Sequence, residues 1–330
     1  MKMDVMNVRR LIPPTALAAA VALGATALTA CSSAAGAAGA EDGKLHVTAS
    51  FYPLQFLAEQ IGGDHVKVDT LTKPGVEPHD LEITPKQTGR LSESDVVLYL
   101  KSLQPAVDKA IAQSGVKNIV DAATLTQLEV HGTSGEEDHD HAAEGHDHDH
   151  GHSHGEAAED PHVWLDPVKY AEIAKGFGAA LEKADPGHAA DYRKNTGELV
   201  AKLGALDTEF KDGLKNTASR TFITTHSAFG YLAERYGLDQ EGISGVDPES
   251  EPSPARMKEL QAVAKKDNVT TVFFETLASD KTAKTLARDT GLQTDVLDPL
   301  EGITDTSQGT DYLEVMRSNL KNLQKALGTK

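Results

Sequence analysis

Short apolar runs alternate with amphipathic stretches along most of the 330-residue chain. In the first half, apolar runs rich in β-branched residues predict strands at 45–50, 66–71, 96–100 and 118–122. The segments between them have the spacing of helices, which we place at 53–63, 84–94 and 104–115. Such alternation is typical of an α/β lobe in which helices cover the faces of a mostly parallel sheet.

The second half of the chain repeats this pattern. Strands are predicted at 221–226, 269–275 and 294–300, and helices at 227–238, 252–268, 278–291 and 311–327. Ser253 followed by Pro254 suits a helix start, because serine is a favoured N-cap and proline a favoured first helical residue. We therefore expect an α/β protein with two Rossmann-like lobes.

A long helix is predicted between the two lobes. One helix covers 166–186, and a second runs from about 186 to 216. On the second helix, apolar residues recur at helical spacing and form one stripe, made of Tyr192, Leu199, Leu203, Leu206, Phe210 and Leu214. At 1.5 Å per residue this helix would span roughly 45 Å. That length is enough for a rigid spine that joins two lobes.

The first thirty residues differ from the rest of the chain. Three basic residues precede an apolar stretch from 11 to 30, as in a secretory signal peptide. The end of that stretch, Leu-Thr-Ala followed by Cys31, resembles the bacterial lipobox, where the signal peptide is cut and the cysteine receives a lipid. An uncleaved anchor or an incidental cysteine is the alternative. Residues 31–43 are mostly small or polar, which predicts a flexible, lipidated tether.

Charge and cysteine content narrow the possible functions. The formal net charge is −18, and it becomes −20 when residues 1–30, with three basic groups and one acidic group, are removed. So acidic a protein is a poor partner for nucleic acid. Because Cys31 is the sole cysteine, no disulfide can form within one chain.

A tract rich in histidine interrupts the first lobe at about 132–160. It has no apolar side chain larger than alanine between Gly132 and Pro161, which predicts a disordered surface loop. Its histidines alternate mainly with acidic residues and glycine, and they are His139, His141, His146, His148, His150, His152 and His154. Without an enforced geometry, these side chains should bind several metal ions weakly. The alternative is a loop that is merely solvated.

Three histidines outside the tract have surroundings that favour a binding site. His79 lies in a loop rich in proline and glycine, His226 ends a predicted strand, and His162 stands in the motif DPHVWLDP, whose prolines and tryptophan should fix its position. In open α/β sheets, sites form beyond the carboxyl ends of strands. We expect the remaining histidines of the lobes, His46, His65 and His188, to be structural or solvated.

A series of motifs gives the chain a family resemblance. In order, these are ASFYPLQFLAEQIGGD, GVEPHDLEITP, the histidine tract, DPHVWLDP, TTHSAFGYLAERYGL, EPSPARMKEL, VFFE and VLDPLEG. The chain resembles the metal-binding lipoproteins of bacterial ABC importers, the cluster A-I solute-binding proteins, and in particular their zinc-specific branch. The resemblance covers essentially the whole chain after the signal peptide. It implies a metal site in the cleft between the two lobes.

The resemblance also implies the ligands of that site. The metal ligands of the family fall on His79, His162 and His226, with a fourth ligand in the loop after the last strand. Glu301 is the favoured fourth ligand, while Asp298 and a water molecule are alternatives. Acidic side chains should orient the imidazoles, and the candidates are Glu77, Asp80, Asp166 and Glu275.

The ligand set favours zinc. Three imidazoles and one carboxylate suit Zn(II), whereas manganese prefers more oxygen ligands. Manganese relatives usually have Glu at the position of His226, by the same resemblance. Ligand type alone does not exclude Cu(II) or Ni(II).

The function that this implies is zinc capture without catalysis. We expect an extracytoplasmic, lipid-anchored, monomeric protein that delivers Zn(II) to an ABC permease with its cytoplasmic ATPase. The histidine tract would be an accessory. The alternatives are a secreted zinc-dependent hydrolase, which would lack an H-E-x-x-H pair, and a binding protein for manganese, nickel or copper. The expected segments are 1–30, 31–43, an N-terminal lobe at 44–185, a linking helix at 186–216 and a C-terminal lobe at 217–330.

Overall fold

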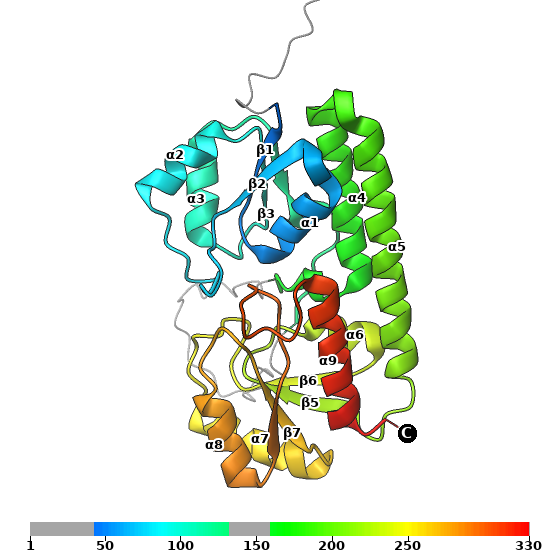
Figure 1. Ribbon diagram of the computed structural model, residues 1–330. Helices are drawn as coiled ribbons and strands as arrows, with labels where there is room; N and C mark the ends of the chain where they lie inside the picture. The colour runs from blue at the N-terminus through cyan, green and yellow to red at the C-terminus, as the bar shows by residue number, and fades with distance from the viewer. Residues whose placement is uncertain (1–42, 132–158, 330) are drawn as a thin grey trace, which may run out of the picture. The chain divides into compact units, whose positions relative to one another are not determined.

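The computed structural model describes residues 43–131 and 159–329 (Figure 1). The predicted signal peptide, the lipidation site Cys31, nearly all of the tether and the seven histidines of the tract lie outside the described residues. Asp160, the residue at which the sequence predicts the disordered surface loop to end, is described and is buried.

The N-terminal lobe is built on a four-stranded parallel sheet. The strands are β1 (Leu45–Ala49), β2 (Val66–Thr70), β3 (Val96–Tyr99) and β4 (Ile119–Asp121), in the spatial order β2-β1-β3-β4. Their connections carry α1 (Tyr52–Gly62), α2 (Pro85–Glu93) and α3 (Pro105–Ser114). Parallel neighbours require such crossovers, and burial by helices on the sheet explains the apolar strand sequences.

The C-terminal lobe has the same topology. Its sheet has the order β6-β5-β7-β8 and is again parallel, with β5 (Thr221–Thr224), β6 (Asp239–Gly242), β7 (Thr271–Phe274) and β8 (Gln293–Val296). The helices are α6 (Gly230–Tyr236), α7 (Pro254–Lys266), α8 (Lys281–Thr290) and α9 (Tyr312–Leu327). As predicted, the Ser253 hydroxyl caps α7 by accepting a hydrogen bond from the Arg256 N–H at 3.1 Å.

The strand β6 was not predicted from the sequence. Its residues, Asp-Gln-Glu-Gly, lack both apolar alternation and β-branched side chains. The strand lies at the edge of its sheet, where its backbone pairs with β5 on one side. This strand therefore forms through its backbone hydrogen bonds rather than through burial of its side chains, and edge strands tolerate polar side chains.

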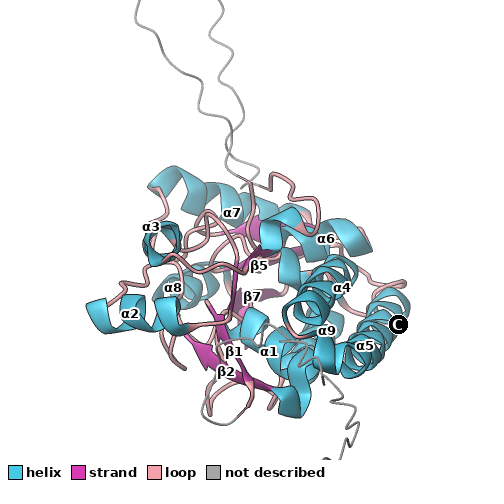
Figure 2. Ribbon diagram, turned by 90° about the horizontal axis from the view of Figure 1, so that it is seen from above, coloured by secondary structure: helices cyan, strands magenta, loops and turns pink. Residues whose placement is uncertain are grey.

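Two long helices run beside the sheets. The first, α4 (Pro167–Ala184), is followed by the short 3₁₀ helix Pro186–His188 and then by α5 (Ala189–Gly213), and α4 and α5 lie side by side (Figures 1 and 2). The stripe predicted on the second helix is buried at every position, from Tyr192 to Leu214. Along its length α5 contacts α1 and α4 from the N-terminal lobe and α9 from the C-terminal lobe. With 25 residues it spans about 38 Å.

The predicted fold class is confirmed: two α/β lobes with parallel sheets are joined by a long helix. The main apolar core includes residues of both lobes and of α5, among them Phe51, Trp164, Phe210 and Tyr312. In the part of the chain that the structure describes, no helix is both long enough and apolar enough to cross a membrane.

Candidate metal centre

Four loops bring the candidate ligands together. His79 lies between β2 and α2, and His226 follows β5 by two residues. His162 precedes the 3₁₀ helix Val163–Leu165, which leads into α4, and Glu301 lies between β8 and α9. The β5 and β8 loops leave the carboxyl ends of their strands, the edge at which α/β sheets bind ligands.

The three imidazoles converge on a single carboxylate oxygen. The Nε2 atoms of His162, His79 and His226 lie 3.1, 3.2 and 3.4 Å from Glu301 Oε1. A tetrahedral metal ion with ligand bonds of about 2.0–2.1 Å separates its ligand atoms by about 3.3 Å. The spacing of these four atoms therefore fits the ligand shell of one tetrahedral ion.

Two of the imidazoles are held in place by buried carboxylates. Asp160 Oδ1 accepts hydrogen bonds from the backbone N–H of His162 at 2.9 Å and from its Nδ1 at 2.7 Å. Glu275 Oε1 lies 2.9 Å from His226 Nδ1 and accepts the Thr225 hydroxyl at 2.7 Å. A proton on Nδ1 leaves the lone pair of a neutral imidazole on Nε2.

This arrangement places acceptor against acceptor at the centre. With Nδ1 protonated, the Nε2 lone pairs of His162 and His226 face the negative Glu301 oxygen, and His226 Nε2 and Glu301 Oε2 are buried atoms without a hydrogen-bond partner among the described residues. A buried acceptor without a donor is costly. A cation between the four atoms removes this conflict, so the residues fit a divalent metal ion.

Without a cation, protonation of the histidines removes the repulsion between their Nε2 lone pairs and the Glu301 carboxylate. Burial lowers the pKa of His226, but the charge of Glu275, its hydrogen bond to the imidazole and the nearby charge of Glu301 outweigh burial and hold the pKa well above its usual value. Burial raises the pKa of Glu301, but the three histidines hold it well below its usual value. Cation binding at this site therefore displaces protons.

Glu77 adds a second carboxyl beside the centre. Its Oε1 accepts the backbone N–H of His79 at 2.8 Å and so shapes the loop that presents this histidine. Burial, together with the charge of Glu301, raises the pKa of Glu77 to about 9. Burial and the charge of Glu301 thus favour the neutral form of Glu77 in the metal-free site.

The position of Glu301 depends on an unusual turn. Leu300 has a φ of 60°, in the left-handed region. Asp298 holds this turn, since its Oδ1 accepts the Leu300 N–H at 2.8 Å and its Oδ2 accepts the Thr276 hydroxyl at 3.0 Å. Both oxygens of Asp298 are thus used within its own lobe, and the structure brings Glu301 rather than Asp298 to the three histidines.

A pocket of about 410 Å³ reaches His79, one of the four candidate ligands. It is lined by His79, Lys101 and Pro161 from the N-terminal lobe and by Asp247 from the C-terminal lobe, among others. The side chain of His79 is 12% exposed, whereas those of the other three candidates are at most 2% exposed. His79 is therefore the ligand that an entering ion meets first.

The other predicted residues have separate places. His46 lies in β1, while His65 and His188 stack on each other at 4.0 Å, near the protein surface. Among the expected orienting acids, Glu275 contacts a ligand imidazole, but Asp80 is exposed, and Asp166 caps α4 and pairs with Arg235. Sequence reasoning missed Asp160, although its place two residues before His162 suits a contact with the backbone N–H of that histidine.

Comparison with known proteins decides the family. A family model described as "Zinc-uptake complex component A periplasmic" matches residues 47–326. The chain belongs to this family. The match covers both lobes and all four candidate ligands, so the family resemblance seen in the motifs is confirmed.

Individual relatives agree with this family. The chain is 39% identical over 302 residues to the high-affinity zinc uptake system protein ZnuA of Bacillus subtilis, which covers 90% of this chain and 92% of that protein. It is 37% identical over 305 residues to the zinc-binding lipoprotein AdcA of Streptococcus pneumoniae, of which it spans 58%. The crystal structure of the Zn(II)-bound ZnuA-like domain of that AdcA is similar with a TM-score of 0.70 at 32% identity, over 86% of this chain and 99% of that one.

Proposed function

We propose that this protein captures Zn(II) outside the cytoplasm and delivers it to an ABC permease for zinc uptake. One observation carries the proposal: three imidazole Nε2 atoms lie 3.1–3.4 Å from one buried carboxylate oxygen, at the spacing of a tetrahedral zinc shell. We assign His79, His162, His226 and Glu301 as the ligands of the transported ion. Membership in the zinc-uptake family supports this assignment.

Zinc fits this donor set better than the other candidate ions. Three nitrogen donors and one oxygen donor in a compact tetrahedral cluster disfavour manganese, which prefers octahedral oxygen ligands. Copper(II) and nickel(II) bind imidazole well but favour square-planar or tetragonal geometry. The buried carboxylates at Nδ1 resist the rearrangement that such a geometry would need.

The site is suited to carriage rather than catalysis. A zinc hydrolase keeps a coordination position for water, with a general base beside it. Here Glu301 supplies the fourth donor and closes the shell, and His162, His226 and Glu301 are buried. A hydrolase remains the competing function, and zinc-loaded protein that cleaves ester or peptide substrates would favour it.

The N-terminal segment places the protein at the membrane. We propose that residues 1–30 are a signal peptide, that Cys31 receives a lipid and that residues 31–43 tether the folded lobes, as a monomer, near the permease and its ATPase. AdcA, a relative, is described as a zinc-binding lipoprotein, which supports the anchor. Metabolic labelling with a radioactive fatty acid should mark the parent protein and leave a Cys31→Ser variant unlabelled.

The histidine tract has an accessory role in this proposal. Its seven histidines, between His139 and His154, supply extra, weaker zinc sites that raise the local supply of the ion. The high-affinity site is built without them.

A zinc titration against a competing chelator tests the proposal. The variants are the parent, a chain that lacks residues 136–156, and His226→Ala, each starting after Cys31. One tight site should survive the deletion and disappear in His226→Ala. Loss of tight binding on deletion alone would make the tract the principal binder and overturn the ligand assignment.

A further inference from the structure

Asp160 holds a second imidazole besides that of His162. Its Oδ1 contacts His162 Nδ1 at 2.7 Å, and its Oδ2 contacts His131 Nδ1 at 2.9 Å. Each imidazole then turns its Nε2 toward a glutamate: His162 lies 3.1 Å from Glu301, and His131 lies 3.0 Å from Glu234. The arrangement of carboxylate, imidazole and glutamate thus occurs twice, on the two sides of one buried aspartate.

A third ligand atom completes the second arrangement. Glu129 Oε2 lies 3.9 Å from His131 Nε2, and the ligand atoms of Glu129, His131 and Glu234 all lie within 4.8 Å of one another. Two ligand atoms of one tetrahedral ion lie roughly 3.3 Å apart. The distance from His131 Nε2 to Glu234, 3.0 Å, is slightly shorter than this, and the distance to Glu129, 3.9 Å, is slightly longer. Small rotations of the two glutamate side chains would equalise them.

The surrounding chain fixes this geometry. The Tyr231 hydroxyl accepts the Glu129 N–H and donates to the Asp160 carbonyl oxygen, both at 2.8 Å, and its ring packs edge-on against His131. At Gly230, a Cβ atom would lie 2.5 Å from the His131 side chain and 2.9 Å from Asp160 Oδ2. A glycine at this position therefore lets the imidazole and the aspartate meet beside α6.

The local charge calls for a cation. Glu129, Asp160 and Glu234 carry three negative charges, and Lys169 returns one positive charge through its 2.7 Å contact with Glu129 Oε1. A neutral His131 leaves two negative charges, which a divalent ion would balance. The competing arrangement is an imidazolium salt bridge, because the hydrogen bonds and charges of Asp160 and Glu234 outweigh burial and raise the pKa of His131.

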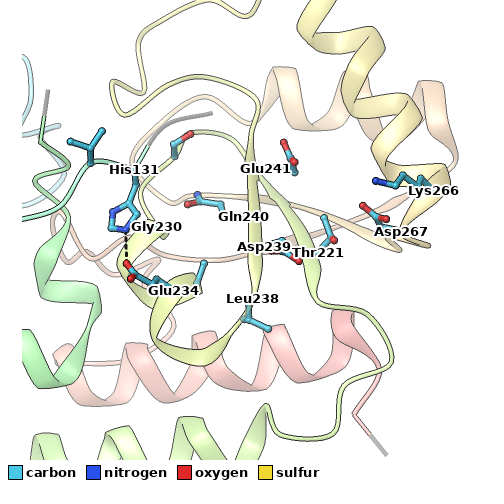
Figure 3. Close-up of a pocket in the computed structure, with 13 residues that line it drawn as sticks. His131, Thr221, Gly230, Glu234, Leu238, Asp239, Gln240, Glu241, Lys266 and Asp267 are labelled. Atoms are coloured by element: carbon cyan, nitrogen blue, oxygen red, sulfur yellow. Dashed lines mark hydrogen bonds and ion pairs between the residues drawn. The ribbon is translucent and has the colours of Figure 1, made fainter. Parts of the chain in front are cut away.

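Ions have access to this place. His131 and Glu234 lie on the wall of a pocket of about 650 Å³, with the contact between them drawn as a dashed line in Figure 3. The Glu234 side chain is 63% exposed. Water can therefore complete the ligand shell, and exposure makes binding weaker than at the buried centre.

We propose that Glu129, His131 and Glu234 form a second divalent-cation site. It lies on the side of Asp160 opposite His162 and the metal centre. Its one nitrogen and two oxygen donors suit Zn(II) and related first-row ions. The proposal does not depend on the first ligand assignment, because none of the three residues belongs to it.

The test uses Zn(II) and the full-length chain, with the seven tract histidines replaced by asparagine. A chelator-competition titration of this background should show two zinc equivalents, one tight and one weaker. Glu234→Gln should weaken the second equivalent at least about 10-fold and leave the tight one unchanged. Glu234 is exposed, so this change should not impair folding. Glu251→Gln, which removes the same charge from another exposed position, should keep both equivalents.

Two results would overturn the proposal. A single equivalent in the background would mean that the cluster is only a salt bridge, and a second equivalent that survives Glu234→Gln would place that ion elsewhere. Zinc anomalous diffraction gives an independent reading, with a peak expected between His131 Nε2 and Glu234. His226→Ala separates the two proposals, since it should remove the tight equivalent and keep the weaker one.

Discussion

The indole N–H of Trp164 donates a hydrogen bond to the carbonyl oxygen of Pro299 at 2.7 Å. This bond joins the segment that carries His162 to the loop that carries Glu301, so it links candidate ligands from the two lobes. The Tyr312 hydroxyl donates to the Trp164 carbonyl oxygen at 2.6 Å and holds the same segment from α9. Trp164 is thus a core residue that also links the two lobes through hydrogen bonds.

Trp164→Phe should therefore affect both stability and zinc binding. The change leaves the Pro299 carbonyl oxygen without its buried donor and opens a space beside Phe51, which should lower the free energy of unfolding by about 2–4 kcal/mol. Zinc affinity should fall because His162 and Glu301 lose their common support. Urea unfolding followed by far-UV circular dichroism measures the first effect. A variant with parental stability and affinity would show that the bond is dispensable.

Glu275→Gln should weaken zinc binding without removing a ligand. Glu275 accepts from His226 Nδ1, and a neutral amide there makes the imidazole a poorer donor to the metal and orients it less firmly. We expect a 10- to 100-fold rise in Kd in a chelator-competition titration. Glu251→Gln is the matched control and should bind as the parent does. Equal affinity in both variants would rule out a role for Glu275 in holding His226.

The stabilisation of the fold by zinc should shrink as the pH falls. The folded-state pKa of His226 lies well above its usual value, and that of His162 is also raised. Protonation of these groups stabilises the metal-free fold fully below the unfolded pKa of about 6.5, and this contribution is lost as pH rises through the folded pKa. Zinc needs the neutral imidazoles, so acid strengthens the metal-free state while it weakens binding.

Thermal unfolding with and without a fixed concentration of free zinc checks this expectation. The difference in Tm should decrease steadily from about pH 8 to pH 6. Glu301 has a lowered pKa and stays ionised over this range, so the trend reports on the histidines. A Tm difference that is constant with pH would argue against histidine ligation.

Patterns with a fixed period were predictable from the sequence. The apolar stripe from Tyr192 to Leu214 predicted the linking helix, and the alternation of strand and helix patterns predicted both sheets. The edge strand β6 was missed because its polar residues pair only through the backbone. The contact of Asp160 with His131 was missed because the two residues lie 29 positions apart in the sequence, and so large a spacing does not indicate how close two residues lie in space.

The choice of Glu301 over Asp298 shows the same limit. Both acids follow β8 within a few residues, so sequence position leaves them nearly equal. The left-handed backbone at Leu300 decides between them, since it turns Asp298 back into its own loop and directs Glu301 to the histidines. A leucine gives no sign in the sequence that it will adopt such a conformation.

The close contact between α4 and α5 gives a prediction about the frame that supports His162. A Cβ atom at Gly178 in α4 would lie 2.2 Å from Thr196 Oγ1, which donates to the Tyr192 carbonyl oxygen at 2.7 Å. Gly178→Ala should therefore force the helices apart and lower the free energy of unfolding by about 1–3 kcal/mol. Because α4 begins five residues after His162, zinc affinity should fall as well.

Gly204→Ala is the matched control for this change. Gly204 is an exposed position in α5, and a Cβ atom there would meet nothing within 4 Å. Alanine should stabilise the helix by roughly 0.5–1 kcal/mol, since it limits the unfolded chain more than glycine does. The two variants make the same chemical change with opposite expected signs in urea unfolding. If both stabilise the protein, the two helices are not in the tight contact that would fix the start of α4, and rigid support of His162 must come from Asp160 and Trp164 alone.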